Sequence, residues 1–288
     1  MSANLTPPAD LDVRALRDLC EQLAREAGAL IVDGRPDDLG VASTKSSATD
    51  VVTVMDQRSQ DLVRERLAAA RPRDAFYGEE EGGASGESGL TWVVDPIDGT
   101  VNYLYGLPAY SVSVAAVIGD PATDGAWRPV AGAVVNPVSG ECYVAALGEG
   151  ATLQVGDGPR RTLRVAEPES LGQTLVATGF GYEAGRRRWQ AAILAEVLGD
   201  VRDIRRLGSA ALDLCRVADG TVDAFYERGL NAWDLAAGWL VVTEAGGVVD
   251  DGTGADPRTA MVLAAAPRTH AALGARLRSA IAVVGEGD

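Results

Sequence analysis

Apolar residues recur every three or four positions near the start of the chain. This spacing places them on one face of a helix, so we predict an amphipathic helix over residues 11–32 that packs on a core. Gly34 and Pro36 follow and end the helix. The apolar stripe consists of Val13, Leu16, Leu19, Cys20, Leu23, Ala27, Leu30 and Ile31.

Short apolar or alternating runs come next, and they are typical of β-strands. A helical stripe interrupts them after Asp56, so Asp56 is expected to cap a second helix. The Gly- and Ser-rich residues 82–89 predict a surface loop. We therefore expect the first half to be an antiparallel sheet backed by two long helices. Its predicted strands cover residues 51–54, 91–94, 111–118, 130–136 and 141–146.

Strand-like and helix-like segments alternate after a predicted hairpin at residues 156–158. Such alternation favours an α/β layered lobe, and no flexible linker separates this lobe from the first half. We assign residues 1–150 to the first unit and residues 151–288 to the second. The predicted strands cover residues 175–178, 201–204, 222–226, 248–250 and 261–265, and the predicted helices cover residues 187–198, 209–218, 234–245 and 272–281.

The composition is that of a globular protein with an acidic surface. Of the 288 residues 47% are hydrophobic, and the formal net charge is −15. Basic residues are scattered, and their densest run, residues 186–188, is expected to be a solvated helix start. Because nucleic acid contacts need concentrated positive charge, no nucleic acid partner is expected. A phosphate ester would also be repelled unless bound cations reverse the local field.

Cysteine and histidine offer little chemistry in this chain. Cys20, Cys142 and Cys215 lie far apart, which argues against disulfides and zinc and favours buried packing in a reducing compartment. The single histidine, His270, is expected at the surface, so a phosphohistidine mechanism is not favoured. No secretory start and no apolar run of roughly 18 residues is visible, which predicts a soluble, cytoplasmic protein without membrane partners.

Two carboxylates stand at the end of an apolar run within residues 92–103. Asp95 and Asp98 follow buried strand positions, and ionised carboxylates are too costly to bury together without a cation. Glu79 ends a second probable strand, and Asp234 opens a long apolar helix. Oxygen ligands without histidine favour magnesium over zinc. The sequence therefore predicts a metal site built from three separate segments.

Taken together, these segments resemble the inositol monophosphatase family, within the lithium-sensitive, magnesium-dependent sugar phosphatases. The resemblance covers nearly the whole chain, and the joint order and spacing of its motifs are specific. It implies an α+β or α/β layered fold, a five-layered αβαβα sandwich, and inhibition by lithium. The motifs are Lys45-Ser46-Ser47, Asp50-Val51-Val52-Thr53, Asp56-Gln57, Gly78-Glu79-Glu80, Asp95 to Thr100, Gly208-Ser209-Ala210-Ala211, Tyr226-Glu227, and Trp233-Asp234 to Gly247.

The resemblance also assigns metal ligands residue by residue. Glu79, Asp95 and the backbone carbonyl of Ile97 would hold one magnesium ion. Asp95, Asp98 and Asp234 would hold a second, so that Asp95 bridges the two ions, and a third ion per active site remains open. The first unit would thus carry most of the metal ligands, and the second unit would add Asp234 and the polyol contacts.

A catalytic set follows from the same resemblance. Thr100 and Asp56 would form a dyad that aims a water molecule and draws its proton, and Lys45 would approach that water. Glu80 would support the site without touching the metal. The implied mechanism is direct in-line attack of a metal-activated water on phosphorus, without a covalent intermediate.

A further set of residues would contact the substrate. Backbone amides at one helix start would hold the phosphate, a second helix start would meet the polyol or phosphate, and carboxylates would accept hydrogen bonds from ring hydroxyls. From the residues alone, Ser209 and Asp234 are equally well explained as helix caps, and Glu227 as an acid at a strand end. The set is Ile97, Asp98, Gly99, Thr100, Gly208, Ser209, Ala210, Glu227 and Asp234.

The implied function is hydrolysis of myo-inositol monophosphate to myo-inositol and phosphate by a homodimer. The partner would be a small-molecule sugar or polyol phosphate. Residues 179–182, Gly-Phe-Gly-Tyr, depart from the family pattern and leave the substrate open. Histidinol phosphate, fructose bisphosphate and 3′-phosphoadenosine phosphate are the alternatives, and a regulatory binding protein that retains the fold is an alternative from another class.

Overall fold

Two β-sheets and the helices around them form the structure, a computed structural model that describes residues 5–8, 11–45, 51–80 and 83–287. Within these ranges seven strands form the larger sheet and five form the smaller one. β1 (Ser43–Thr44) and β2 (Val51–Val52) pair in a separate antiparallel ribbon. The motif residues Ser46, Ser47 and Asp50 lie outside the described residues.

The larger sheet is antiparallel except at one edge. Its strand order is β3-β4-β5-β6-β7-β8-β9, and β3 alone runs parallel to its neighbour, β4. The predicted antiparallel sheet is therefore confirmed for the pairs from β4 onwards. The strands are β3 (Ala75–Gly78), β4 (Leu90–Asp98), β5 (Ser111–Gly119), β6 (Trp127–Asn136), β7 (Glu141–Ala146), β8 (Gly150–Val155) and β9 (Arg161–Thr162).

β4 extends beyond its predicted end and carries two acids. Asp95 lies opposite Ser113 and Asp98 opposite Ser111, so three steps along β4 face two steps along β5. In a regular strand, residues three apart point to opposite faces of the sheet. The β-bulge between Asp95 and Asp98 changes this alternation and lets both carboxylates reach the same side.

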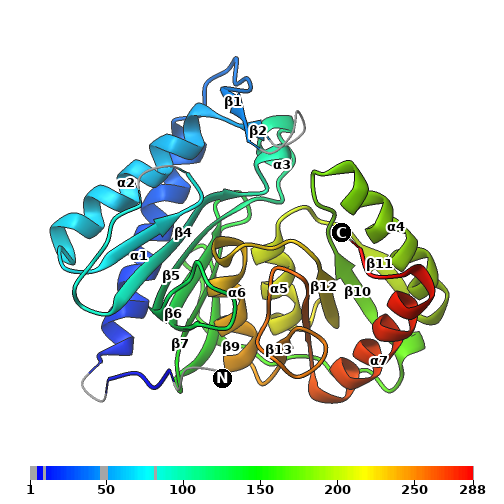
Figure 1. Ribbon diagram of the computed structural model, residues 1–288. Coiled ribbons are helices and arrows are strands. Elements are labelled where there is room, and N and C mark those ends of the chain that lie inside the picture. Colours follow the sequence, from blue (N-terminus) through cyan, green and yellow to red (C-terminus); the bar gives the residue numbers. More distant parts are fainter. Residues whose placement is uncertain (1–4, 9–10, 46–50, 81–82, 288) are drawn as a thin grey trace.

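Two helices cover the outer face of the larger sheet (Figure 1). α1 (Val13–Asp33) matches the predicted helix, with the Asp12 side chain accepting from the Ala15 amide at its start and Gly34 at its end. α2 (Val54–Ala70) begins earlier than predicted because Thr53 caps it, so the predicted strand over residues 51–54 is only the short β2. Asp56 is consequently not the N-cap; it is the third residue of α2 and bonds back to the Thr53 amide.

The smaller sheet mixes parallel and antiparallel pairs. Its order is β11-β10-β12-β14-β13; β11, β10 and β12 are parallel, whereas β14 is antiparallel to both of its neighbours. The predicted alternation of strands and helices in this half is confirmed. The strands are β10 (Leu175–Thr178), β11 (Asp203–Arg205), β12 (Ala224–Glu227), β13 (Val248–Asp250) and β14 (Val262–Ala265).

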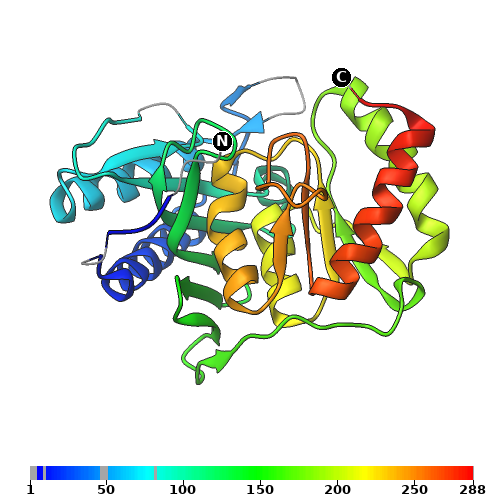
Figure 2. The same ribbon diagram turned by 60° about the horizontal axis from the view of Figure 1, so that its bottom comes forward.

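Helices α5 (Ala210–Asp219) and α6 (Ala232–Glu244) lie side by side between the two sheets (Figure 1 and Figure 2). One apolar cluster joins them to the inner faces of both sheets, for example through Tyr143 and Phe225. α4 (Ala184–Val197) and α7 (Pro267–Val284) pack on the outer face of the smaller sheet. The layers therefore alternate as αβαβα, which confirms the predicted fold. Short helices α3 (Thr100–Tyr105), η1 (Leu171–Gln173) and η2 (Leu198–Asp200) complete the described elements.

The cysteines and the histidine have structural surroundings. Cys20, Cys142 and Cys215 are buried and free, as predicted. The surface prediction for His270 is wrong: α7 starts at Pro267, five residues before its predicted start, so His270 lies in the first turn and its Nε2 is 2.8 Å from Asp250 Oδ1. Its side chain is only 12% exposed. None of the helices in the described ranges is both long enough and apolar enough to span a membrane.

Candidate active site

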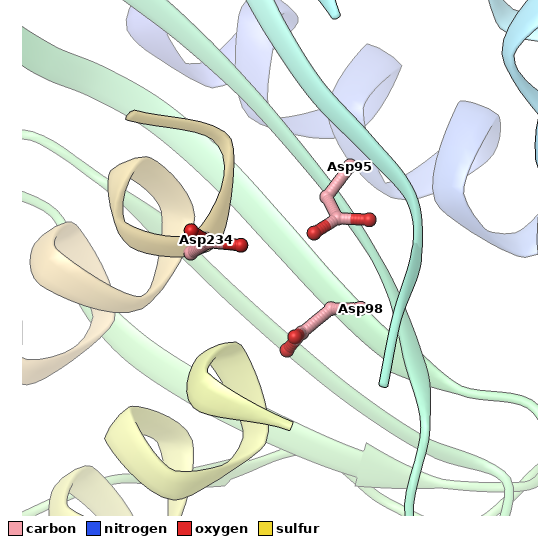
Figure 3. A group of neighbouring side chains, drawn as sticks. All are labelled: Asp95, Asp98 and Asp234. Carbon is pink, nitrogen blue, oxygen red and sulfur yellow. The ribbon is translucent and has the colours of Figure 1, made fainter. Parts of the chain in front are cut away.

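Three carboxylates from two distant elements meet at the bulged end of β4. Asp95 and Asp98 come from β4, and Asp234 comes from the first turn of α6 (Figure 3). Each offers an oxygen that lies within 4.8 Å of the others. Local bonds fix the outer two: Asp98 Oδ2 accepts from Ser209 Oγ at 2.6 Å and from the Ala211 amide at 2.7 Å, and Asp234 Oδ2 accepts from the Asn231 amide at 2.7 Å.

The cluster carries an unfavourable concentration of negative charge. Burial, followed by repulsion from Glu79 and Asp98, raises the pKa of Asp95 well above its usual value. Burial and the charges of Asp98 and Glu79 do the same to the pKa of Asp234. The pKa of Asp98 is raised to about 6 by burial, against the opposing hydrogen bonds from Ser209 and the α5 amides. A cation held among these oxygens would remove the repulsion, and the all-oxygen donor set suits magnesium.

Glu79 reaches the same site from the end of β3. Its amide donates to the Val94 carbonyl at 3.1 Å, which fixes it beside β4. Lys45 Nζ lies 2.8 Å from Glu79 Oε1 and 2.6 Å from Glu80 Oε1, so one ammonium group bridges both glutamates. Burial raises the pKa of Glu79, and Lys45 opposes that rise. Lys45 and Glu80 are thus tied to a predicted metal ligand by ion pairs.

Gln60 on α2 was missed by the sequence reasoning, although it shapes this corner. Its Nε2 donates to the Glu80 carbonyl at 3.0 Å, and its Oε1 accepts from the Glu80 amide at 3.0 Å. A Cβ on Gly78 would stand 2.0 Å from the Gln60 oxygen, so glycine is needed at that position. The two bonds fix the backbone that carries Glu79 and Glu80.

The predicted partners Thr100 and Asp56 are in contact. Thr100 Oγ1 lies 3.1 Å from Asp56 Oδ1 and 3.0 Å from the Ile97 carbonyl. The other carboxylate oxygen, Asp56 Oδ2, accepts from the Thr53 amide at 2.8 Å and from Thr53 Oγ1 at 2.6 Å. Burial raises the pKa of Asp56 to about 6 against these hydrogen bonds. Asp56 is therefore oriented toward the threonine, and its role in catalysis stays a prediction.

The helix starts of α3 and α5 lie against each other at the site. Gly99 has φ +95°, and a Cβ there would stand 2.9 Å from the Gly208 carbonyl, so the two glycines allow the close approach. Ser209 caps α5, which confirms its interpretation as a cap, and the Ala210 amide lies 3.3 Å from Asp98 Oδ1. Ser209 and the α5 amides thus hold a metal-site carboxylate. Their predicted contact with substrate remains untested.

One pocket of about 440 Å³ unites these groups. It extends from the acid cluster to residues 179–182, and Asp56 and Glu80 are not among its lining residues. The predicted residues on its lining are Lys45, Glu79, Asp95, Ile97, Asp98, Gly99, Thr100, Gly208, Ser209, Ala210, Glu227 and Asp234. Sequence reasoning did not assign the lining residues Asp213, Arg186 and Arg206 to the site.

Asp213 and Glu227 form a second acidic position in the pocket. Asp213 is 1% exposed, and its Oδ1 has no hydrogen-bond partner within the described part of the chain. Burial, then the charge of Asp213, raises the pKa of Glu227 to about 8, and Arg206 opposes the rise. Asp213 could have been found from the sequence because it lies between Leu212 and Leu214 on a helix that is predicted to be buried. A carboxylate is costly to bury there unless it binds something.

The chain belongs to the inositol monophosphatase family, whose sequence profile matches residues 12–282. This confirms the resemblance found from the motifs. The inositol-1-monophosphatase of Mycobacterium leprae is 45% identical over 285 residues, covering 93% of this chain and 95% of that protein. The Nus factor SuhB of Pasteurella multocida is 40% identical over 251 residues, covering 85% and 89%.

Solved structures agree with this assignment. Mycobacterium tuberculosis SuhB superposes with a TM-score of 0.77 at 41% identity and covers 96% of this chain and 99% of that one. The extragenic suppressor protein suhB from Bartonella henselae superposes with a TM-score of 0.81 at 35% identity, with 92% and 98% coverage. Family and relatives together indicate a phosphatase of the inositol monophosphatase family.

Proposed function

We propose that the protein hydrolyses myo-inositol monophosphate to myo-inositol and phosphate. The observation that carries the proposal is the convergence of Asp95, Asp98 and Asp234 within 4.8 Å in a pocket that Thr100 also lines. An acid cluster of this kind repels a phosphate ester by itself. It serves phosphate chemistry only when cations reverse the field, which the family assignment supports.

We propose magnesium as the cofactor, with two or three ions per active site. Glu79, Asp95 and the Ile97 carbonyl would hold one ion, and Asp95, Asp98 and Asp234 another. When bound, magnesium supplies positive charge at the phosphate and favours deprotonation of the attacking water. The raised pKa of Asp95 and of Asp234, caused first by burial, supports this fit because such carboxylates gain most from a cation.

Thr100 and Asp56 would position the attacking water and receive its proton. The Thr100 hydroxyl donates to Asp56 Oδ1, which leaves its oxygen lone pairs to accept a hydrogen bond from water. Asp56 is fixed by Thr53, so the acceptor of the proton is preorganised. Lys45 would lie near the water and keep Glu79 and Glu80 in place.

The phosphate would lie beside the acid cluster, and the polyol would lie next to it, farther along the pocket. The Gly99 and Thr100 amides would hold the phosphate beside Asp98, and attack would be in line without a covalent intermediate. Glu227 and Asp234 would accept hydrogen bonds from ring hydroxyls, with Gly208, Ser209 and Ala210 on the adjoining wall. The described lining contains no histidine or cysteine, so direct water attack is the mechanism these side chains support.

A regulatory binding role is the second candidate. It is supported by relatives such as the Pasteurella multocida protein, which is named a Nus factor.

We also propose that the protein is a cytoplasmic homodimer and that lithium inhibits it. The buried free cysteines suit a reducing compartment.

A substrate panel tests these possibilities. Phosphate release is measured with and without magnesium from myo-inositol 1-phosphate, histidinol phosphate, fructose 1,6-bisphosphate and 3′-phosphoadenosine 5′-phosphate. We expect the highest kcat/KM for the inositol ester. No release from any ester would leave the binding role, and a clear preference for another ester would correct the substrate.

A further inference from the structure

Four glycines on the pocket wall make room for charged side chains. A Cβ on Gly179 would stand 1.9 Å from a Glu227 carboxylate oxygen, and a Cβ on Gly208 would stand 2.5 Å from Arg206 Nη1. Gly181 and Gly229 both leave space for Arg186. Gly208 and Gly229 also have positive φ, a backbone conformation that favours glycine. Both the backbone conformation and the missing side chains therefore leave room for the charged groups.

Arg186 is held in the outer wall without an ion-pair partner. A Cβ on Gly229 would stand 2.3 Å from Arg186 Nη1, and one on Gly181 would stand 2.7 Å from Arg186 Cδ. Glu183, the acid nearest in sequence, is engaged elsewhere, because its carboxylate accepts from the Gly185 and Arg186 amides at 2.9 and 2.7 Å. Within the described ranges the Arg186 guanidinium makes no hydrogen bond or ion pair.

Arg206 presents a second guanidinium to the same pocket. It follows β11 and lies against Gly208, close to the start of α5. Its charge opposes the rise in the pKa of Asp98 and of Glu227, although no carboxylate of the described residues lies within ion-pair distance of it. Arg206 therefore lies toward the acid cluster.

The charges are arranged in sequence along the pocket. The acid cluster of Asp95, Asp98 and Asp234 occupies one end, and Glu227 lies within electrostatic reach of Asp98 and Asp234. Arg186 opposes the raised pKa of Glu227 and also lines an adjoining hollow of about 390 Å³ beside α4. A substrate whose phosphate lies at the acid end would thus extend past Glu227 toward an unpaired guanidinium.

We infer that Arg186, supported by Arg206, forms a second anion subsite for polyol phosphates that carry another anionic group, a phosphoryl or a carboxylate. The inference rests on the proposed phosphatase function, because it assumes that the scissile phosphate lies at the acid cluster. A guanidinium presents donors in a planar fork that fits either anion in a bidentate arrangement. An uncharged inositol ring would make no use of this positive charge.

The test compares three substrates and three variants. Fructose 1,6-bisphosphate carries a second phosphoryl group, 6-phosphogluconate carries a carboxylate, and myo-inositol 1-phosphate carries neither. Arg186→Gln should raise KM for the two doubly anionic probes about tenfold or more, the size expected for a lost bond between charged groups. kcat should stay within twofold, and KM for the inositol ester should change less than twofold.

Matched variants separate charge from helix position. Arg187→Gln changes an exposed neighbour on α4 that does not line the pocket, and we expect it to leave all constants unchanged. Arg186→Lys keeps the charge but lacks the planar fork, so it should recover only part of the affinity. A response of only one doubly anionic probe would support the subsite and identify its anion.

The outcomes that oppose the inference are distinct from failure of the proposed function. If the wild-type protein hydrolyses the inositol ester while neither doubly anionic probe reacts or competes, the subsite is refuted alone. Equal effects of Arg186→Gln and Arg187→Gln would refute it too. If only the doubly anionic probes react, the subsite stands and inositol is wrong as the substrate.

Discussion

At the scale of single residues, the Thr100 hydroxyl has one proton and two acceptors. Asp56 Oδ1 lies 3.1 Å away and the Ile97 carbonyl 3.0 Å away, so the proton can serve only one of them at a time. When Thr100 donates to Asp56, its lone pairs are left to accept a hydrogen bond from a water in the pocket that Thr100 lines. The pair can then guide a proton from water to a carboxylate that Thr53 already holds in place.

Replacement of Asp56 tests that pathway. Asp56→Asn keeps the shape of the side chain and an oxygen that can accept from Thr53, yet it cannot take up a proton. We expect kcat to fall by about 10²–10⁴-fold, the usual size of a general-base contribution, with KM changed only severalfold. The control is Asp61→Asn on the same helix, where the side chain is 47% exposed. Near-normal kcat in Asp56→Asn would exclude Asp56 as the proton acceptor.

At the scale of elements, a bulge and a close contact assemble the site. The bulge in β4 brings Asp95 and Asp98 to one side, and the short connection through Gly99 brings α3 against the start of α5. Ser209 and the α5 amides then hold Asp98. The geometry of the acid cluster therefore depends on two short backbone features more than on any helix as a whole.

Gly99→Ala tests the close contact. Both Gly99 and Gly106 have positive φ, but a Cβ on Gly106 meets open space, whereas one on Gly99 meets the Gly208 and Ala109 carbonyls at 2.9 and 3.1 Å. Each substitution should cost about 1–2 kcal/mol for the backbone conformation alone. We expect Gly99→Ala to lower the melting temperature further and to reduce kcat/KM, while Gly106→Ala retains activity. Equal behaviour of the two variants would argue against a role for the contact.

The same elements show what sequence patterns can predict. Periodicity predicts α1 because that helix buries one face. The central strands β5 and β6 are predicted instead from continuous apolar runs, since both of their faces are buried. Periodicity could not predict the end of β4, since a bulge leaves no mark on hydrophobic spacing. A polar residue before an apolar stripe predicts that Asp56 is the cap. Thr53 instead provides the cap, and the Asp56 side chain accepts a hydrogen bond from the Thr53 amide.

At the scale of the whole molecule, the site lies where the two sheets and the helices between them meet. β4, α5 and α6 each deliver a side chain to the pocket, and β12 adds Glu227. Motif order predicted most of these residues. Arg186, Arg206 and Asp213 were not predicted. In sequence Arg186 resembles a solvated helix start, Asp213 a buried helix position and Arg206 a connecting residue, and only the fold brings them to the pocket.

This convergence makes the stability of the metal-free protein depend on pH. Burial and the charge of Asp213 raise the pKa of Glu227 to about 8, above the value of about 4.3 for an unfolded glutamate. The folded state then binds more protons than the unfolded state between these values, so this group increases the free energy of unfolding as pH falls from 8 to 6. The charge of Asp98 also raises the pKa of Glu227, whereas the charges of Arg206 and Arg186 lower it. The value of about 8 is the result of all these effects.

Thermal unfolding with a chelator present measures this effect. We expect the melting temperature to rise from pH 8 to pH 6 in the wild-type protein and to rise less in Glu227→Gln, which lacks the titrating group. Glu65→Gln, an exposed change on α2, should behave as the wild type does. An equal rise in wild type and Glu227→Gln would show that Glu227 does not titrate in this range.

We propose that the carboxylates of Asp95, Asp98 and Asp234 together hold magnesium for phosphate ester hydrolysis. The most direct measurement is the initial rate of phosphate release from myo-inositol 1-phosphate during magnesium titration, for the wild type and for Asp95→Asn. We predict a saturable magnesium dependence in the wild type and loss of turnover in Asp95→Asn, because the bridging ligand is removed. Turnover without magnesium, or a near-normal rate in Asp95→Asn, would show that these carboxylates do not hold a catalytic magnesium ion.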